Sequence, residues 1–206
     1  MKASISSISI LVLLMTLHPL PAGAQETSPL SDSALLALYE GLRVADVSDG
    51  LDMVGLRDRG LMDPAIVPLW KDVEQMDHMI RGIALTARYV PTNRVVENPM
   101  DPETFQKWEG AWYNKISPEP WIEGIGEGTI VVLDVNGDGD VGSVGSFNSM
   151  LYVEKGARGI VSNGGIRDTD EIIKQRIPVY LDMDHRGRGI RPGRNELESW
   201  NKPVTV

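Results

Sequence analysis

An arginine and three acids lie within the stretch GIVSNGGIRDTDE, from Gly159 to Glu171. The guanidinium of Arg167 is permanently charged, and it can hold a carboxylate or a carbonyl oxygen through paired hydrogen bonds. Asp168, the next residue, supplies carboxylate oxygens, which are the ligands that hard divalent cations prefer. We interpret Arg167 as a clamp for a small anionic substrate and Asp168 as a metal ligand, with Glu171 supporting the metal directly or through water.

The same acids also fit a structural role at the start of a helix. Asp168 and Glu171 have the spacing of a capping box, in which both side chains accept hydrogen bonds from backbone N–H groups. One carboxylate oxygen can cap a helix while the other binds a cation. The spacing therefore leaves both roles open.

The surrounding residues predict a strand that turns directly into a helix. An apolar pair suits the end of a buried strand, and Gly164 and Gly165 permit backbone angles that other residues avoid. Residues 168–176 then have helical spacing. Side chains at such a corner point into the crevice at the carboxyl end of the strand, where free N–H groups of a helix attract anions. The apolar face of the helix comprises Ile172, Ile173 and Ile177.

The glycine-rich segment after the apolar run 129–135 fits two ligand-binding patterns only in part. Its glycines match the dinucleotide pattern G-x-G-x-x-G, but Asp138 and Asp140 would repel a pyrophosphate. Its polar residues match the first half of a calcium loop, but Gly145 stands where that loop has a bidentate Glu. We therefore prefer a polar turn at the end of a strand. The glycines are Gly137, Gly139 and Gly142, and the calcium-loop residues are Asp134, Asn136, Asp138 and Asp140.

Strands and helices alternate along the rest of the chain, which indicates an α/β protein. Residues 91–123 contain three of the five tryptophans, and we interpret them as an ordered insertion that covers the surface or, alternatively, closes over a site. Helices are predicted within 31–62, at about 103–114 and at about 147–155, and strands at 66–69, 82–90 and 129–135.

Residues 1–24 are typical of a secretory signal. Lys2 provides the positive start, residues 8–17 the apolar core, and Ala22-Gly23-Ala24 a small-residue cleavage site. The apolar run is too short to span a membrane. We therefore expect an exported protein, periplasmic or extracellular, whose mature chain comprises residues 25–206 and has no membrane span.

Composition restricts the partners and the means of stabilisation. The 206 residues include no cysteine, so stability must come from the packed core of one domain. A net charge of −9 would repel the phosphates of nucleic acid, so no nucleic-acid partner is expected. His78 and His185 are isolated in the sequence, and we expect each to be a surface residue or a hydrogen-bonded structural residue rather than a metal ligand. A basic run fits a solvated loop, which we prefer, or a clamp for acidic groups; it comprises Arg186, Arg188, Arg191 and Arg194.

Several phrases of the sequence resemble one protein family. In chain order they are VADVSDGLDMVG, RGIALTARYV, GTIVVLDVNGDGD, GARGIVSNGGIRDTDEI and IPVY. From about Leu38 to Val206 the chain resembles the RraA-like proteins, which include the 4-hydroxy-4-methyl-2-oxoglutarate aldolases and the regulators of ribonuclease activity A. The most specific phrase is GGIRDTDE, which holds the family's Arg-Asp pair at Arg167 and Asp168, followed by Glu171.

The resemblance implies a three-layer β/β/α domain of the swivelling-domain type that assembles as a homotrimer or homohexamer. It also implies a divalent-metal-dependent carbon–carbon lyase, of aldolase or oxaloacetate-decarboxylase type, that acts on a small 2-oxo acid through a pyruvate enolate. Asp168 would ligate Mg²⁺ or Mn²⁺, with Glu171 beside it, and Arg167 would contact the pyruvyl part. The substrate carboxylate would meet backbone N–H groups of Ser146, Phe147 and Asn148.

Departures from the family favour an alternative, a non-catalytic binding or scaffold protein with the same fold. Ser146 stands where the family has Asp or Gly, and Phe147 and Asn163 replace acids. The family continues past Val206 into further glycine-rich strands, so we expect a shortened C-terminus. Because an exported, acidic protein would not meet a cytoplasmic ribonuclease, we prefer a lyase to a ribonuclease regulator.

Overall fold

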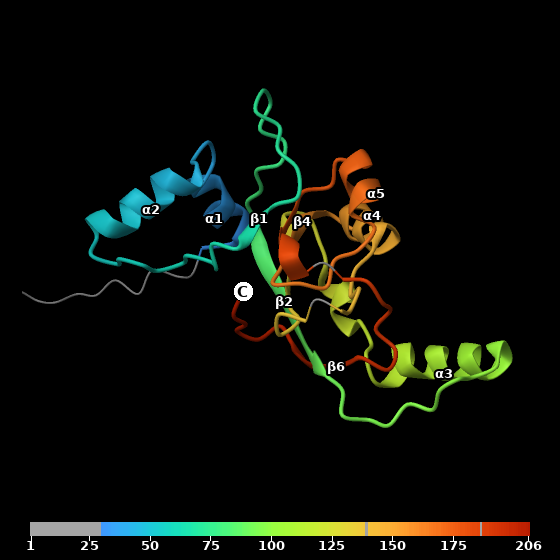
Figure 1. Ribbon diagram of the computed structural model, residues 1–206. Coiled ribbons are helices and arrows are strands. Elements are labelled where there is room, and N and C mark those ends of the chain that lie inside the picture. The colour runs from blue at the N-terminus through green and yellow to red at the C-terminus, as the bar shows by residue number, and fades with distance from the viewer. Residues whose placement is uncertain (1–29, 139, 186) are drawn as a thin grey trace, which may run out of the picture. The chain divides into compact units, whose positions relative to one another are not determined.

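Two helices and then two strands begin the chain, after which helical segments and strands alternate as the sequence predicts (Figure 1). The computed structural model describes residues 30–138, 140–185 and 187–206, so the predicted signal at 1–24 lies outside the described residues. The helices are α1 (Asp32–Leu38), α2 (Val44–Met53), α3 (Pro102–Lys115), α4 (Ser146–Glu154) and α5 (Thr169–Lys174), with 3₁₀ turns η1 (Pro120–Gly124) and η2 (Met183–His185). The strands are β1 (Ile66–Pro68), β2 (Ile83–Pro91), β3 (Thr129–Asp134), β4 (Ala157–Ser162), β5 (Val179–Asp182) and β6 (Asn195–Trp200). No helix in the described part of the chain is long and apolar enough to cross a bilayer.

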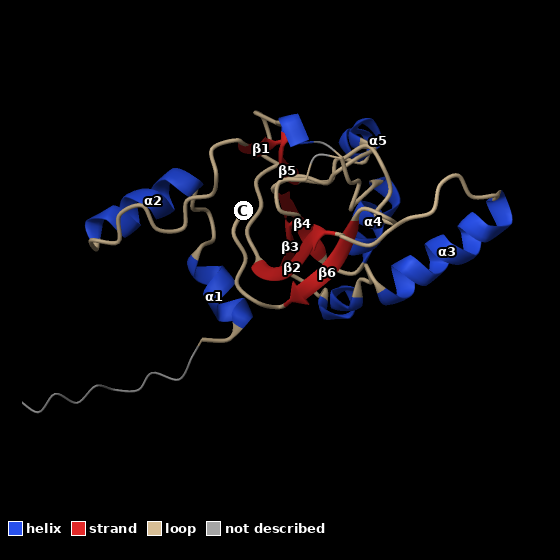
Figure 2. Ribbon diagram, turned by 60° about the horizontal axis from the view of Figure 1, so that its bottom comes forward, coloured by secondary structure: helices blue, strands red, loops and turns tan. Residues whose placement is uncertain are grey.

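The described strands belong to one sheet, in the order β1-β5-β4-β3-β2-β6 (Figure 2). The inner strands β5, β4, β3 and β2 run parallel to one another, and β1 and β6 pair antiparallel at the two edges. The predicted α/β fold is thereby confirmed, as a mixed six-stranded sheet with helical connections. Because parallel strands share a direction, the segments after β3, β4 and β5 leave the sheet at the same edge.

Two apolar clusters lie on opposite faces of the sheet, because side chains alternate along each strand. In β3, Val131 and Leu133 belong to the larger cluster and Val132 to the smaller one. The smaller cluster packs against Val204 and Val206, near the C-terminus. α4, α5 and η1 each contribute a fully buried side chain to the larger cluster, namely Tyr152, Ile172 and Trp121.

The tryptophan-rich segment is ordered, as predicted, and part of it belongs to the core. Its helix α3 begins after Asp101, whose side chain caps the first turn. Trp121 is fully buried, and its ring packs edge-on against Tyr152 with the ring centroids 5.2 Å apart. Trp112 is 5% exposed, and its indole N–H donates to the carbonyl of Asn195 at 2.9 Å. The interpretation of this segment as a plain surface cover is wrong for these two rings, because Trp121 belongs to the larger apolar cluster and Trp112 is buried beside Asn195 of β6.

Two details differ from the sequence predictions. The pattern NELESW does not predict strand β6, because its residues do not alternate between apolar and polar types. Pairing with β2 at the edge of the sheet makes it a strand, and an edge position tolerates charged side chains. Ile173 is 43% exposed, so it does not belong to the predicted apolar face of α5. Neighbouring helical residues point about 100° apart, and Ile172 takes the place against the sheet.

Candidate functional site

Arg167 and Asp168 lie in the loop between β4 and α5, at the carboxyl edge of the parallel strands. Gly164 and Gly165 in this loop have φ angles of 152° and 73°, which favour glycine. The N–H of Arg167 donates to the carbonyl of Val144 at 2.9 Å, and the N–H of Val144 donates to the carbonyl of Gly165 at 3.0 Å. This pairing of two loops brings Arg167 and Asp168, here called the Arg-Asp corner, against the start of α4.

Asp168 does not cap its own helix. It directly precedes α5 with left-handed φ and ψ angles of 55° and 36°, and its side chain makes no capping hydrogen bond. Its Oδ2 instead accepts a hydrogen bond from the N–H of Ser146, the first residue of α4, at 3.2 Å. The capping-box interpretation is therefore wrong, because the carboxylate points to another helix. A non-glycine residue in this backbone conformation costs about 1–3 kcal/mol, and such strain is concentrated at functional sites.

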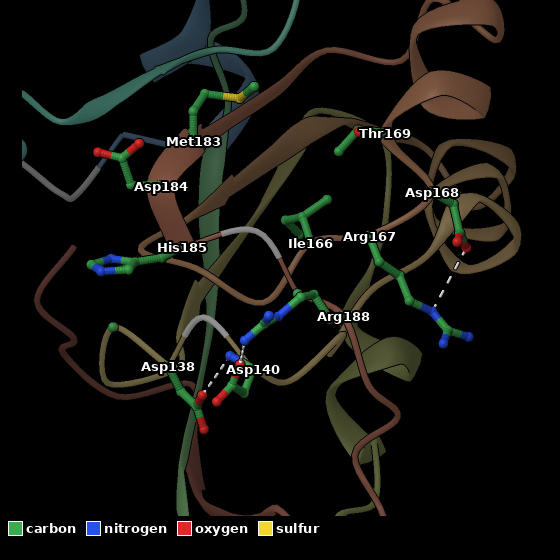
Figure 3. Close-up of a pocket in the computed structure, with 12 residues that line it drawn as sticks. Asp138, Asp140, Ile166, Arg167, Asp168, Thr169, Met183, Asp184, His185 and Arg188 are labelled. Atoms are coloured by element: carbon green, nitrogen blue, oxygen red, sulfur yellow. Dashed lines mark hydrogen bonds and ion pairs between the residues drawn. The ribbon is translucent and has the colours of Figure 1, made fainter.

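The side chain of Arg167 lies beside the Asp168 carboxylate (Figure 3). Its Nε is 3.8 Å from Oδ2 of Asp168, and the two side chains are 39% and 40% exposed. The stem of Arg167 packs over Gly142, where an added Cβ would lie 2.5 Å from Cδ. The Nε atom is buried and has no hydrogen-bond partner among the described residues. A buried donor without a partner is unfavourable, so an oxygen of a bound ligand would be stabilised there.

Glu171 joins the same corner through Ser146. The hydroxyl of Ser146 donates to Oε2 of Glu171, while the N–H of Ser146 donates to Asp168. Gly145, which precedes the helix, leaves room for this arrangement, because a Cβ there would collide with the Asp168 carboxylate. Ser146 therefore holds the two predicted metal-binding acids next to each other.

The backbone groups predicted to hold a substrate carboxylate are in the first turn of α4. This turn carries no side-chain cap and no acidic residue of its own. No hydrogen bond of the Phe147 or Asn148 N–H is recorded among the described residues, and the Phe147 side chain is 69% exposed. Such N–H groups at a helix start attract anions. The side chain of Asn148 points elsewhere, since its Nδ2 lies 3.4 Å from Oε2 of Glu119.

A cavity of about 800 Å³ opens at this edge, among the loops that follow β3, β4 and β5. Arg167 and Asp168 line it, but Glu171 and the start of α4 do not. His185, expected to be a surface or structural residue, also lines it, with Nδ1 2.8 Å from Oδ2 of Asp182. The sequence did not link this loop to the site, because His185 carries no motif. Other charged residues of the cavity are Asp138, Asp140, Asp184 and Arg188, of which Arg188 pairs with Asp140.

The calcium-loop interpretation is wrong, because the first acid of that pattern, Asp134, is buried and bonded to other groups of the protein. Asp134 is 1% exposed, and its Oδ2 pairs with Arg88. Its Oδ1 accepts hydrogen bonds from the N–H of Asn136 and from the side chain of Asn163, both at 2.9 Å. Both carboxylate oxygens of Asp134 are therefore engaged within the protein, and neither is available as the first ligand of a calcium loop. Gly139, at the sharp turn of that pattern, lies outside the described residues.

Asn163, which replaces an acid in the family that the chain resembles, completes this arrangement. Its Oδ1 accepts a hydrogen bond from the N–H of Val135 at 2.8 Å, and its Nδ2 donates to Asp134 and, at 3.2 Å, to the carbonyl of Thr205. An acid at this position would face the Asp134 carboxylate. The exchange of acid for amide is thus explained by the local hydrogen bonds.

We expect Asn163→Asp to lower the free energy of unfolding by about 1–3 kcal/mol at neutral pH, because two donors are lost and a like charge meets Asp134. The neighbouring carboxylate raises the pKa of the new acid in the folded state, so the loss grows as the pH rises through that pKa and shrinks at acidic pH. Urea unfolding at neutral and acidic pH measures this. Asn163→Ala is the control, and an equal pH dependence in both variants would contradict the charge argument.

A buried ion pair between Arg191 and Glu119 lies next to α4. Nη1 of Arg191 is 3.1 Å from Oε1 of Glu119, and the two side chains are 6% and 15% exposed. The guanidinium carbon lies 5.5 Å from the ring centroid of Tyr89 and 5.0 Å from that of Tyr113. The prediction of a solvated loop is therefore wrong for Arg191, because the chain folds it between aromatic rings. A buried charge requires a partner, and Glu119 provides it.

Hydroxyl groups extend this pair to α4. Burial raises the pKa of the Tyr89 and Tyr152 hydroxyls, so both remain protonated donors. Tyr152 donates to Oε1 of Glu119 at 2.9 Å, and Tyr89 donates to the carbonyl of Pro118 at 2.8 Å. Since Asn148 also contacts Glu119, the pair holds α4 at two successive turns. None of these residues has a spacing that marks it in the sequence.

The charged groups at the Arg-Asp corner fit a magnesium-type site better than a site built from protein ligands alone. Among the described residues, no group of three or more His, Cys, Asp or Glu side chains gathers to hold a metal ion. Magnesium is commonly held by one or two carboxylates, with waters and substrate oxygens completing its shell. Asp168 fits this pattern, because among the described residues only one of its two carboxylate oxygens, Oδ2, accepts a hydrogen bond.

Comparison with known proteins gives a family context. A family model described as RraA-like, aldolase/RraA, matches residues 44–206. No curated protein matches the chain. One similar solved structure, described as novel cellulases from microbes associated with the gut ecosystem, has a TM-score of 0.62 at 20% identity, over 89% of this chain and 72% of that chain.

Two further solved structures have the same architecture. RraAS2 of Streptomyces coelicolor, described as an unusual member of the RNase ES inhibitor RraA protein family, has a TM-score of 0.60 at 17% identity, over 86% of this chain and 76% of that chain. An uncharacterized protein of Pseudomonas syringae pv. tomato has a TM-score of 0.59 at 21% identity, over 87% of this chain and 71% of that chain. At these identities the likeness shows the fold alone.

Proposed function

The chain belongs to the RraA-like family, and from that premise we propose that it is a divalent-metal-dependent carbon–carbon lyase acting on a small 2-oxo acid. The reaction would be that of a 4-hydroxy-4-methyl-2-oxoglutarate aldolase or an oxaloacetate decarboxylase. One observation carries the proposal: the Arg167 guanidinium and the Asp168 carboxylate lie 3.8 Å apart on the wall of an open cavity, beside a helix start.

The two reactions place the same demand on the site. Each breaks a carbon–carbon bond at the carbon next to a 2-oxo group, and the electron pair left there is delocalised onto the carbonyl oxygen as an enolate. A positive donor aimed at that oxygen contributes about 10²- to 10³-fold to the rate. Arg167 suits this role, because its guanidinium stays charged and its Nε lacks a partner among the described residues.

The substrate carboxylate would bind at the start of α4. The N–H groups of Phe147 and Asn148 carry the partial positive charge of a helix start, and the Asp168 carboxylate, which also lies at this helix start, accepts from the N–H of Ser146. The hydrogen bond from Ser146 to Asp168 holds this turn next to the Arg-Asp corner. A carboxylate on the helix and a 2-oxo group at Arg167 would therefore belong to one small molecule.

Asp168 would hold Mg²⁺ or Mn²⁺, and Glu171 would support it from the other side of Ser146. Bound there, the cation would supply Lewis-acid polarisation of the 2-oxo group. The residues of the chain would orient the substrate and stabilise the enolate. Neither a Schiff-base lysine nor an organic cofactor is needed for this chemistry.

A non-catalytic binding or scaffold protein is the second candidate. It is favoured by the hydrogen bonds that both acids already make within the fold, since Asp168 accepts from the N–H of Ser146 and Glu171 from its hydroxyl. Acids engaged in this way stabilise the contact between α4 and α5 without a metal. A family member that has lost the reaction would keep this contact.

Pyruvate release by the purified full chain distinguishes the two candidates. We expect release from oxaloacetate or from 4-hydroxy-2-oxo acids in Mg²⁺ or Mn²⁺, and none after the metal is removed with EDTA. Glu171→Gln is expected to weaken metal affinity by about 10- to 100-fold, and Asp168→Asn by more, because Asp168 would be the direct ligand. Calorimetric titration with Mn²⁺ measures that affinity independently of turnover. Absence of metal-dependent release from every substrate would favour the scaffold.

Export and assembly are further proposals that rest on the sequence and on the family. The N-terminus of exported protein is expected to begin at Gln25, which Edman sequencing or mass spectrometry determines. A homotrimer or homohexamer is expected from light scattering. An N-terminus at Met1 in the exported fraction would contradict cleavage of the signal.

A further inference from the structure

The segment that leads into β6 forms a tight turn that its sequence favours. Pro192 and Gly193 occupy the two central positions, and the N–H of Arg194 donates to the carbonyl of Arg191 at 2.9 Å. Gly193 has a φ of 77°, as a type II turn requires at its third position, and proline suits the position before it. The N–H of Thr92 donates to the carbonyl of Arg194 at 2.8 Å, so the turn is held against the segment that follows β2.

A cavity of about 410 Å³ lies between this turn and α3, and we call it the aromatic pocket. Phe105 and Trp108 of α3 line it, with their ring centroids 5.7 Å apart. The Trp108 ring is held from two sides, because its centroid is 5.4 Å from that of Trp112 and an added Cβ on Gly193 would lie 3.2 Å from it. The aromatic walls are therefore packed in place within this chain. The other apolar residues of the pocket are Val96, Ile190 and Pro192.

Arg194 is the single charged residue that lines the aromatic pocket in the described part of the chain. Its Nη1 donates to the carbonyl of Ile190 at 2.9 Å, which is the one side-chain hydrogen bond recorded for Arg194 among the described residues. The guanidinium packs over Gly189, where an added Cβ would lie 2.5 Å from Cζ. Its position is thus set by the protein, while Nε and Nη2 can still donate to a ligand. The amide of Asn98, at the same pocket, is a further donor.

One cation among aromatic walls favours a flat ligand that carries one negative charge. A guanidinium presents parallel N–H groups that match the two oxygens of a carboxylate. The chain has a net charge of −9, which opposes an anion of higher charge such as a phosphate monoester. Small-molecule sites are commonly cavities of about 300–1,000 Å³ with apolar and aromatic walls and a few polar groups that fix orientation, and the aromatic pocket has these properties.

We propose that the aromatic pocket binds an aromatic monocarboxylate, with the ring of the ligand against Phe105 and Trp108 and its carboxylate on Arg194. Ring contacts with Trp and Phe add to the burial of apolar surface, so a saturated ring would bind less well. An uncharged ligand would forgo the paired hydrogen bonds to the guanidinium. The pocket is separate from the Arg-Asp corner, because no described residue lines both cavities.

Calorimetric titration of the full chain with 2-naphthoate tests the aromatic pocket. We expect saturable binding of one ligand per chain. Arg194→Gln should weaken that binding by about 10- to 100-fold, because hydrogen bonds to a charged group are lost. Trp108→Leu should weaken it by about 10-fold, because a ring contact is lost. Arg188→Gln is the matched control and should bind as the parent does, because Arg188 is an exposed arginine of the same segment that lines the other cavity.

Comparison of ligands on the parent chain provides a second measurement that does not depend on whether a variant folds. We expect 2-naphthalenemethanol, which keeps the rings but has no charge, to bind about 10-fold more weakly than 2-naphthoate. Cyclohexanecarboxylate, which keeps the charge but has no aromatic ring, should also bind about 10-fold more weakly. Equal binding of either compound would overturn the proposal, and so would tighter binding of 2-naphthyl phosphate.

Two further outcomes would overturn the assignment of the ligand to this pocket. One is a parent that 2-naphthoate does not saturate, or an Arg194→Gln variant that binds it as the parent does. The other is loss of 2-naphthoate binding in Arg167→Ala, which would assign the carboxylate to the Arg-Asp corner. We expect Arg167→Ala to bind 2-naphthoate normally. None of these measurements depends on pyruvate release, so the aromatic pocket and the proposed activity are tested separately.

Discussion

Replacing Arg167 with alanine is expected to lower metal-dependent pyruvate release by about 10²- to 10³-fold. The guanidinium lies 3.8 Å from the Asp168 carboxylate, and its Nε has no partner among the described residues. Its removal takes a positive charge away from the place where the enolate oxygen would develop. Because that interaction strengthens as the bond breaks, kcat should fall by more than KM rises. Steady-state kinetics of the full chain measures both constants.

Two control variants test whether the loss of pyruvate release is specific to the Arg167 side chain. Arg158 is at the amino end of β4, the strand that precedes the loop of Arg167, and it pairs with Glu127 at the surface, so Arg158→Ala should leave the kinetics unchanged. Arg167→Lys should retain part of the rate, because it keeps a charge but loses the planar fork. The stability of Arg167→Ala is expected to stay within about 1 kcal/mol of the parent in urea unfolding. Pyruvate release that Arg167→Ala leaves unaltered would remove Arg167 from the mechanism.

Glu119→Ala is expected to have the largest effect on stability, a loss of about 3–5 kcal/mol in the free energy of unfolding. The side chain of Arg191 is 6% exposed, and without Glu119 its charge would be buried without its counterion. Tyr152 would also lose the acceptor of its hydroxyl, at 2.9 Å, and Asn148 its contact at the first turn of α4. Urea or thermal unfolding measures the loss, and weaker binding of an anionic substrate should accompany it.

A double variant separates the unpaired charge from simple loss of packing. Glu119→Leu/Arg191→Met removes both charges, and it should be more stable than Glu119→Ala alone. Glu127→Ala breaks the exposed pair with Arg158 and should change stability by no more than about 1 kcal/mol. Equal losses from Glu119→Ala and Glu127→Ala would show that burial of the Arg191 charge is not what stabilises this region.

Much of the fold could be predicted from local patterns. Helices α3, α4 and α5 and strands β1 to β4 lie close to their predicted positions, because apolar periodicity, glycines and caps act over a few residues. Ser31 accepts a hydrogen bond from the N–H of Ala34, as a helix cap should. Strand β6 escaped prediction, since its conformation depends on β2, which lies far away in the sequence.

The candidate site could be predicted in part. The pattern GGIRDTDE identifies Arg167 and Asp168 as neighbours at a corner between strand and helix, and the structure has them on one cavity. The pattern also permitted a helix cap, which is wrong because Asp168 has a left-handed backbone and turns toward Ser146. Glu119 and Arg191 could not be recognised as a pair, because they lie far apart in the sequence and no motif or spacing connects them.

The sequence by itself determined the family, the order of the helices and strands apart from β6, and the chemical groups at the Arg-Asp corner, because these depend on residue types and on spacings along the chain. Only the tertiary structure decided the partner of each polar group. Asp168 meets Ser146, which lies 22 residues earlier, and Arg191 is buried against Glu119. The physical reason is that a buried charge or hydrogen bond requires a partner in space, and the partner is set by which loops meet at the edge of the sheet.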